Sequence, residues 1–91
     1  MNILNKYKQI FCKFDHIGNY EANELCHLKE GDVVKVSHMN ETFWVALTKN
    51  KNNGRKLQGK VDDNLFLAHG FDFGDVVKFN ASNVLRYESV I

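Results

Sequence analysis

Apolar residues recur at every second position of the segment Thr42–Thr48, and this pattern constrains the fold of the chain more than any other feature. Such alternation is typical of a strand that buries one of its faces. The face expected in the core carries Phe43, Val45 and Leu47. The opposite face carries Trp44, Ala46 and Thr48. The chain therefore contains at least one strand of a sheet that packs over a core.

Turn residues separate further segments with strand character, which are 7–14, 32–38, 56–62 and 76–79. Asn53-Gly54 predicts a tight hairpin between Thr42–Thr48 and 56–62, because both residues tolerate positive φ. In 56–62 the core face carries Leu57, Gly59 and Val61, and in 7–14 one face carries Ile10, Cys12 and Phe14. Gly59 indicates a bend or bulge of the sort that closes small barrels.

Two segments outside these strands have helical character. Residues 20–28 predict a short helix, because Asn19 can cap it and Leu25 and Leu28 recur at helical spacing. Ser82 is expected to cap a last helical turn that runs through Val84, Leu85 and Tyr87. The apolar residues 65–73 are expected to form a linking loop.

One motif occurs twice, as G-D-V-V-K-V at 31–36 and G-D-V-V-K-F at 74–79. Two turn-to-strand entries of one design suggest two similar positions in one curved sheet. We predict a mainly β (α+β) fold: a small, strongly bent antiparallel β-barrel of about five strands. The interior should be lined by Val34, Val45, Leu47, Val61 and Val77. The alternative is an open four- or five-stranded sheet with the helix across one face.

A chain of 91 residues is expected to form one domain, 1–91, with 31–85 as the barrel core and 1–30 as a strand plus a short helix. No segment has the roughly 18 consecutive apolar residues that span a bilayer. No apolar region follows the amino terminus, so we expect no export, a cytoplasmic location and reduced thiols at Cys12 and Cys26.

Four strings within residues 31–85 carry a family resemblance: G-D-V-V-K-V, F-W-V-A-L-T, G-K-V-D-D-N and F-G-D-V-V-K-F-N-A-S-N-V-L. They resemble a bacterial family of small uncharacterised domains with a Src-homology-3-like small barrel. Here Asp62-Asp63-Asn64 contains one acidic residue more than the family pattern, and Ala46 stands where a charged residue is frequent. The resemblance implies the barrel fold, and it implies no reaction and no catalytic residues.

The sequence carries no catalytic signature. Its serines (Ser37, Ser82 and Ser89) lie in no strained elbow, and Asp62 and Asp63 are read as a turn cap exposed to solvent. Cys12, His16, Cys26 and His27 lack the paired spacing of a zinc site, because the adjacent Cys26 and His27 project in different directions. We therefore expect a non-enzymatic protein with no catalytic residue, no metal and no cofactor.

The charges are nearly balanced overall but unevenly placed. A net charge of +1 and an isoelectric point near 7.8 exclude a strongly basic nucleic-acid binder by bulk charge alone. Residues 1–13 and 49–60 contain bases without acids, 61–75 contain acids without bases, and 14–32 are mainly acidic. Such blocks predict a bipolar surface or charges that neutralise each other across neighbouring strands.

The hairpin at 49–60 supports a nucleic-acid-binding hypothesis. Its basic residues are Lys49, Lys51, Arg55, Lys56 and Lys60. Trp44 lies on the outer face of the neighbouring strand, and small barrels hold single strands with a basic hairpin beside an aromatic platform. The competing interpretation is a solvated hairpin tip.

The aromatic residues support a protein-docking hypothesis, which we place first. A core of this size cannot bury eleven aromatic rings, so the loop 65–73 should expose some of them. The expected partner-binding residues are Trp44, Phe66, Phe71 and Phe73. Eleven asparagines and no proline suggest an AT-rich bacterial or phage genome. We expect a monomer or small homo-oligomer that inhibits or modulates a host or defence enzyme. In the competing interpretation, the loop 65–73 folds back and plugs the barrel.

Overall fold

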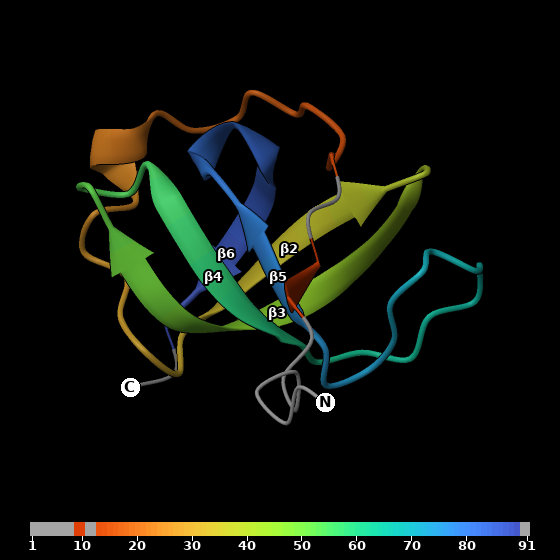
Figure 1. The fold of residues 1–91 in the computed structure, drawn as a ribbon. Helices are drawn as coiled ribbons and strands as arrows, with labels where there is room; N and C mark the ends of the chain where they lie inside the picture. The colour runs from red at the N-terminus through yellow and green to blue at the C-terminus, as the bar shows by residue number, and fades with distance from the viewer. Residues whose placement is uncertain (1–8, 11–12, 90–91) are drawn as a thin grey trace.

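The computed structural model describes residues 9–10 and 13–89, and its main feature is one strongly curved sheet (Figure 1). The strands are β1 (Gln9–Ile10), β2 (Val33–His38), β3 (Glu41–Lys51), β4 (Lys56–Val61), β5 (Val76–Phe79) and β6 (Val84–Glu88). Within these residues the helical elements are the 3₁₀ turns η2 (Ala22–Glu24) and η3 (Ala81–Asn83), neither of which could cross a bilayer. The prediction of a mainly β fold is confirmed.

The sheet has the order β1-β5-β4-β3-β2-β6. Strands β2 to β6 pair antiparallel, whereas β1 runs parallel to β5. Among the described residues the two edge strands, β1 and β6, do not pair with each other. The hydrogen-bonded ladder is therefore open, and the closed barrel that we predicted is not confirmed.

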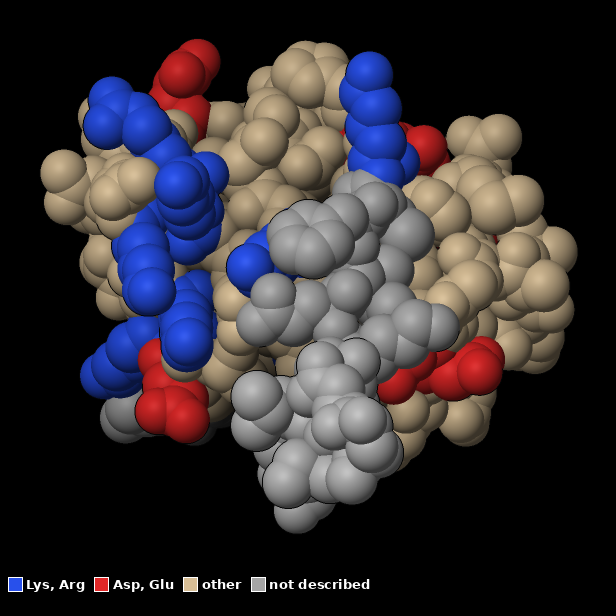
Figure 2. All heavy atoms as spheres, viewed as in Figure 1, with Lys and Arg blue, Asp and Glu red and all other residues tan. Residues whose placement is uncertain are grey.

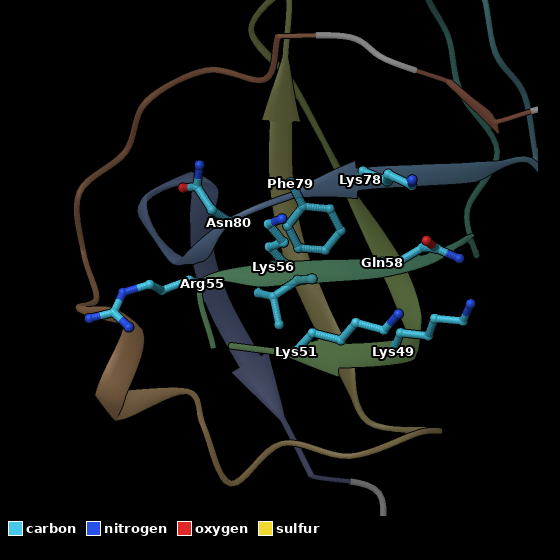
Figure 3. Close-up of a pocket in the computed structure, with 9 residues that line it drawn as sticks. Lys49, Lys51, Arg55, Lys56, Gln58, Lys78, Phe79 and Asn80 are labelled. Atoms are coloured by element: carbon cyan, nitrogen blue, oxygen red, sulfur yellow. The ribbon is translucent and has the colours of Figure 1, made fainter. Parts of the chain in front are cut away.

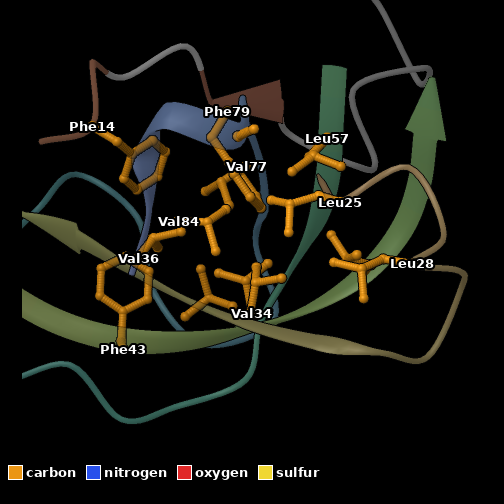
Figure 4. Packing of buried hydrophobic residues seen from close by; sticks show 14 of the residues in the cluster. Phe14, Leu25, Leu28, Val34, Val36, Phe43, Leu57, Val77, Phe79 and Val84 are labelled. Carbon is orange, nitrogen blue, oxygen red and sulfur yellow. The ribbon is translucent and has the colours of Figure 1, made fainter. Parts of the chain in front are cut away.

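The concave side of the sheet encloses the core (Figure 4). The five residues predicted to line it (Val34, Val45, Leu47, Val61 and Val77) are all at most 1% exposed. Phe14 reaches this core from the chain segment before η2 and packs against the ring of Phe79, with ring centroids 5.9 Å apart. The period-two patterns thus identified the buried faces correctly, because a strand alternates its side chains between core and solvent.

The helix expected over residues 20–28 is wrong. Only the three residues of η2 are helical in this segment, and Glu21 occupies the position before η2 that we assigned to Asn19. The side-chain amide of Asn50 donates 2.9 Å hydrogen bonds to the carbonyls of both Leu25 and Leu28. Leu25 and Leu28 still enter the core, so packing on the sheet decided the backbone here and helical spacing did not.

The expected C-terminal helical turn is also wrong in its extent. The 3₁₀ turn η3 spans Ala81–Asn83, and Asn80 caps it in place of Ser82, accepting a 2.9 Å hydrogen bond from the Ser82 N–H. The residues that follow form β6, which pairs with β2. Without β6, the backbone N–H and C=O groups along this edge of β2 would have no partner strand. Pairing them stabilises the chain more than continuing a helical turn would.

The first expected strand, 7–14, is seen in part. Gln9 and Ile10 pair with Val76 and Val77 as β1, and residues 13–14 have left the strand. Tyr7, Lys8, Phe11 and Cys12 lie outside the described residues.

Candidate functional site

A β-bulge in β3 decides which side chains face solvent near the end of that strand. Leu47 is opposite Gly59 and Lys49 is opposite Gln58, so Thr48 is an additional residue in β3. The bulge reverses the alternation, because Asn50 now points inward and Lys49 outward. Continued alternation from Leu47 would have directed Lys49 into the core.

At the bulge, β3 and β4 approach each other closely, and Gly59 permits this because it has no side chain. A Cβ at Gly59 would lie 2.4 Å from the carbonyl oxygen of Ala46 and 2.6 Å from Cγ1 of Val45. The prediction that Gly59 marks a bend or bulge is therefore confirmed, with the bulge lying on the opposite strand.

The bulge assembles a cationic surface on three adjacent strands, which we call the basic face and define as Lys49, Lys51, Lys56, Gln58 and Lys78. Lys51 pairs with Lys56, and Gln58 of β4 pairs with both Lys49 of β3 and Lys78 of β5. These residues line a groove of about 620 Å³ (Figure 3). Its floor is formed by the largely buried side chains of Leu57 and Phe79.

Two of the five basic residues predicted for the hairpin lie at the margin of the basic face. Arg55 lines the groove but extends away from the lysines (Figure 3), and it also lines a neighbouring hollow with Glu21. Lys60 is exposed, pairs with Ala46, and does not line the groove. Lys78 was missed from sequence, although antiparallel pairing of 56–62 with 76–79 would have placed it beside Gln58.

The hairpin tip is fixed against η2, which positions Arg55. Asn52, Asn53 and Gly54 all have positive φ, so the turn includes one more left-handed residue than the predicted Asn53-Gly54 pair. Gly54 is buried, and a Cβ there would lie 2.2 Å from the carbonyl oxygen of Ala22. Only glycine fits this contact.

The acidic residues of 61–75 lie at the other ends of the strands that carry the basic face. Asp62 follows β4 at the end away from Lys56, and six residues of strand span about 20 Å. Asp75 likewise precedes β5, at the end away from Phe79. Charges this far apart are largely screened at physiological ionic strength, where the Debye length is about 8 Å. In Figure 2 most of the blue groups gather on the left of the view, with red groups above and below them, and another blue group stands apart at the upper right.

Ion pairing does not neutralise the exposed lysines of the basic face. Among residues 9–10 and 13–89 the one ion pair is that of His69 with Glu41. Lys49, Lys51 and Lys56 are exposed, and no described carboxylate lies within salt-bridge distance of them. Three ammonium groups are thus available to an external anion.

The rings predicted to bind a partner are not equivalent in the structure. Phe71 is 3% exposed and belongs to the core, so its assignment to a partner surface is wrong. Trp44 is half-buried, and the ammonium nitrogen of Lys35 lies 5.5 Å from the centre of its ring. Phe66 and Phe73 are 93% and 63% exposed. The loop therefore acts both as a plug, through Phe71, and as an exposed apolar segment.

A partly buried polar cluster of His38, Glu41 and His69 was missed from sequence, because it joins the β2–β3 hairpin to the distant loop. Nδ1 of His38 lies 2.7 Å from Nδ1 of His69, and Nε2 of His69 lies 2.7 Å from Oε1 of Glu41. Burial and the neighbouring His69 lower the pKa of His38. Hydrogen bonds from the Phe66 N–H and from His69 lower the pKa of Glu41.

The residues considered for zinc do not come together in the described part of the chain. Cys26 is exposed and donates through Sγ to the carbonyl of Asn23, at 3.1 Å. The ring of His27 packs on Tyr87, with centroids 5.5 Å apart. Cys12 lies outside the described residues, and among the rest no three potential metal ligands form a group.

Comparisons with protein-family models, curated proteins and solved structures found no match for this chain.

Proposed function

We propose that this protein is a non-enzymatic binding module that holds single-stranded nucleic acid against the basic face. The observation that carries the proposal is the placement of Lys49, Lys51 and Lys56 on one exposed surface, with no carboxylate of the described residues within salt-bridge distance of them. Like charges opposite each other in a sheet destabilise the fold. An anionic ligand that bridges them removes this repulsion on binding.

The dimensions of the groove favour a single strand over a duplex. Lys49 and Lys51 are two residues apart on β3, about 7 Å along the strand, and the next strand lies about 4.8 Å away. A flexible phosphodiester chain can follow such a narrow path, and proteins that bind single strands use charged grooves of this kind. The one ring on the groove floor, that of Phe79, is largely buried, so we expect phosphate contacts to dominate and sequence preference to be weak.

Fluorescence anisotropy of a labelled single-stranded oligonucleotide at increasing salt tests this function. Three phosphate contacts predict a slope of about −2 for log affinity against log salt. The double variant Lys51→Gln/Lys56→Gln should make that slope shallower by about 1.4. A control that removes the same charge elsewhere, Lys29→Gln/Arg86→Gln, should retain the wild-type slope. The proposal fails if low salt gives no binding, or if both double variants weaken binding equally.

Protein docking is a second candidate, and the exposure of Phe66 favours it. Glu41 accepts hydrogen bonds from the backbone N–H groups of Phe66 and Leu67, at 2.7 and 2.9 Å. A fixed backbone that presents a 93% exposed ring lowers the entropy cost of inserting that ring into a pocket of a partner. An inhibitor or modulator of an enzyme could use this apolar contact.

Affinity capture with four immobilised forms separates the two candidates. A protein partner should bind wild type and Lys51→Gln/Lys56→Gln, and should be lost from Phe66→Ser. Met39→Ser is the control, because it removes an exposed apolar side chain from the β2–β3 turn and leaves the rings of the loop in place. Equal retention on Phe66→Ser and wild type would exclude docking through Phe66.

A further inference from the structure

The loop between β4 and β5 is held to the β2–β3 hairpin by one carboxylate. Glu41 follows the two-residue turn of Met39 and Asn40, both of which have positive φ. Its side chain accepts the N–H groups of Phe66 and Leu67 and bonds Nε2 of His69. Three groups of the loop thus converge on Glu41.

The second attachment is the contact between two imidazoles. His69, with a side chain that is fully buried, lies between Glu41 and His38. The ring of Phe71 stacks on that of His69, with centroids 5.3 Å apart, and Phe43 lies 5.8 Å away. Because these neighbours are apolar, the buried imidazole of His69 must satisfy its hydrogen bonds within the cluster.

Counting protons shows which charge states the cluster tolerates. Nε2 of His69 donates to the carboxylate, and the two Nδ1 atoms can share only one proton, since one must donate and the other accept. A neutral pair satisfies both bonds, and so does a pair with one positive charge. Two charged imidazoles would place an N–H on each Nδ1, so that the 2.7 Å contact becomes repulsive.

We propose that His38, His69 and Glu41 form a pH-sensitive latch that releases the loop residues 64–70 from the β2–β3 hairpin when both imidazoles become charged. Release frees the Phe66 and Leu67 N–H groups and changes how their side chains are presented. The latch acts independently of the basic face.

The charged and titratable groups around the latch set the direction of its pH response. Burial and His69 lower the pKa of His38, whereas Asp15, in the segment before η2, acts in the opposite direction. Asp15 is itself held by the hydroxyl of Ser37, at 2.6 Å, and by the N–H of Asn40. Phe14, Phe43 and Phe71, which complete the surroundings, carry no charge. His38 should therefore become charged only below about pH 6.5, the ordinary pKa of histidine.

Proton–nitrogen correlation NMR of the full chain tests the latch. The amide protons of Phe66 and Leu67 should resonate downfield at neutral pH, because both bond a carboxylate. These shifts should be lost together as the pH falls from about 6.5 to about 5. The amide resonances of the core residues Val45 and Val77 should stay unchanged, which distinguishes local release from unfolding. Amide shifts that do not move over this range would overturn the proposal.

Three variants assign the transition to the histidine pair. His38→Asn keeps an amide near the position of Nδ1 but cannot take a proton, so both amides should stay downfield to about pH 4, where carboxylates titrate. His16→Asn, which changes an exposed histidine, should leave the transition as in wild type. Glu41→Gln should lose the downfield shifts at every pH. A transition in His38→Asn at the wild-type midpoint would contradict the latch; if that variant does not fold, the Glu41→Gln result still decides the anchoring role.

Discussion

Lys51 and Lys56 lie directly opposite each other at the turn end of the β3–β4 hairpin. Two ammonium groups in this position repel, and the structure offers them no carboxylate among its described residues. We therefore interpret the pair as part of a surface for anions and not as a device that stabilises the sheet.

Replacing Lys51 by Glu should stabilise the fold slightly and abolish binding at the basic face. The new carboxylate would face Lys56, and an attractive cross-strand pair in place of a repulsive one is worth about 0.5 kcal/mol. Urea unfolding at low salt measures the gain, which added salt should reduce. A variant that is less stable at low salt would contradict this reading of the pair.

Gly59→Ala should destabilise the protein by about 3 kcal/mol, in the upper range for overpacking. The added methyl group would meet the Ala46 carbonyl oxygen at 2.4 Å, and this backbone atom cannot turn away as a side chain could. Gly70→Ala is the informative comparison, since its Cβ would meet nothing within 4 Å and its cost would be the strain of positive φ alone. In thermal unfolding, Gly59→Ala should have a much lower melting temperature than Gly70→Ala. The reverse order would contradict the conclusion that β3 and β4 approach closely at Gly59.

Asn50→Ala should cost about 2 kcal/mol, because it leaves the carbonyls of Leu25 and Leu28 without their donor. Asn64→Ala, in the exposed loop, is the control and should change the free energy of unfolding by less than about 0.5 kcal/mol. Chemical denaturation of both variants checks the prediction. Equal stability of the two would show that Asn50 does not hold the segment after η2.

The free energy of unfolding should decrease as the pH falls, in two stages. The folded protein lowers the pKa of His38, so the unfolded chain binds protons more readily, and stability starts to fall below about pH 6.5. The lowered pKa values of Glu41 and Asp15 add a second loss below about pH 4. Urea midpoints measured across this range should decline throughout, and a midpoint that rises between about pH 6.5 and 5 would contradict the sign.

The sequence predicted the parts of the fold that depend on local alternation. Phe43, Val45 and Leu47 are buried as expected, because a strand with one apolar face has only one way to cover it. The segment at 20–28 was misassigned because Leu25 and Leu28 can reach the core without a helix, once Asn50 bonds their carbonyls. That contact joins residues more than twenty positions apart, and a local pattern carries no information about it.

The candidate site was predictable only in part. The basic hairpin was visible in the charge pattern, but the bulge at Thr48 that turns Lys49 outward, and the neighbour Lys78 on β5, depend on the register of strands. The histidine latch was hidden for the same reason, since His38 and His69 belong to segments joined only by the fold. The number of aromatic residues predicted that the loop exposes some of its rings, but it could not predict which ring of the loop is buried.

The most direct test of the proposed function is to map an oligonucleotide onto the protein by NMR. On titration with a short single-stranded DNA at low salt, the account predicts that the amides of Lys49, Lys51, Lys56, Gln58 and Lys78 shift together. Residues 62–75 should stay in place in the same spectra. Shifts confined to the loop, or none at all, would contradict the assignment of the basic face as the binding surface.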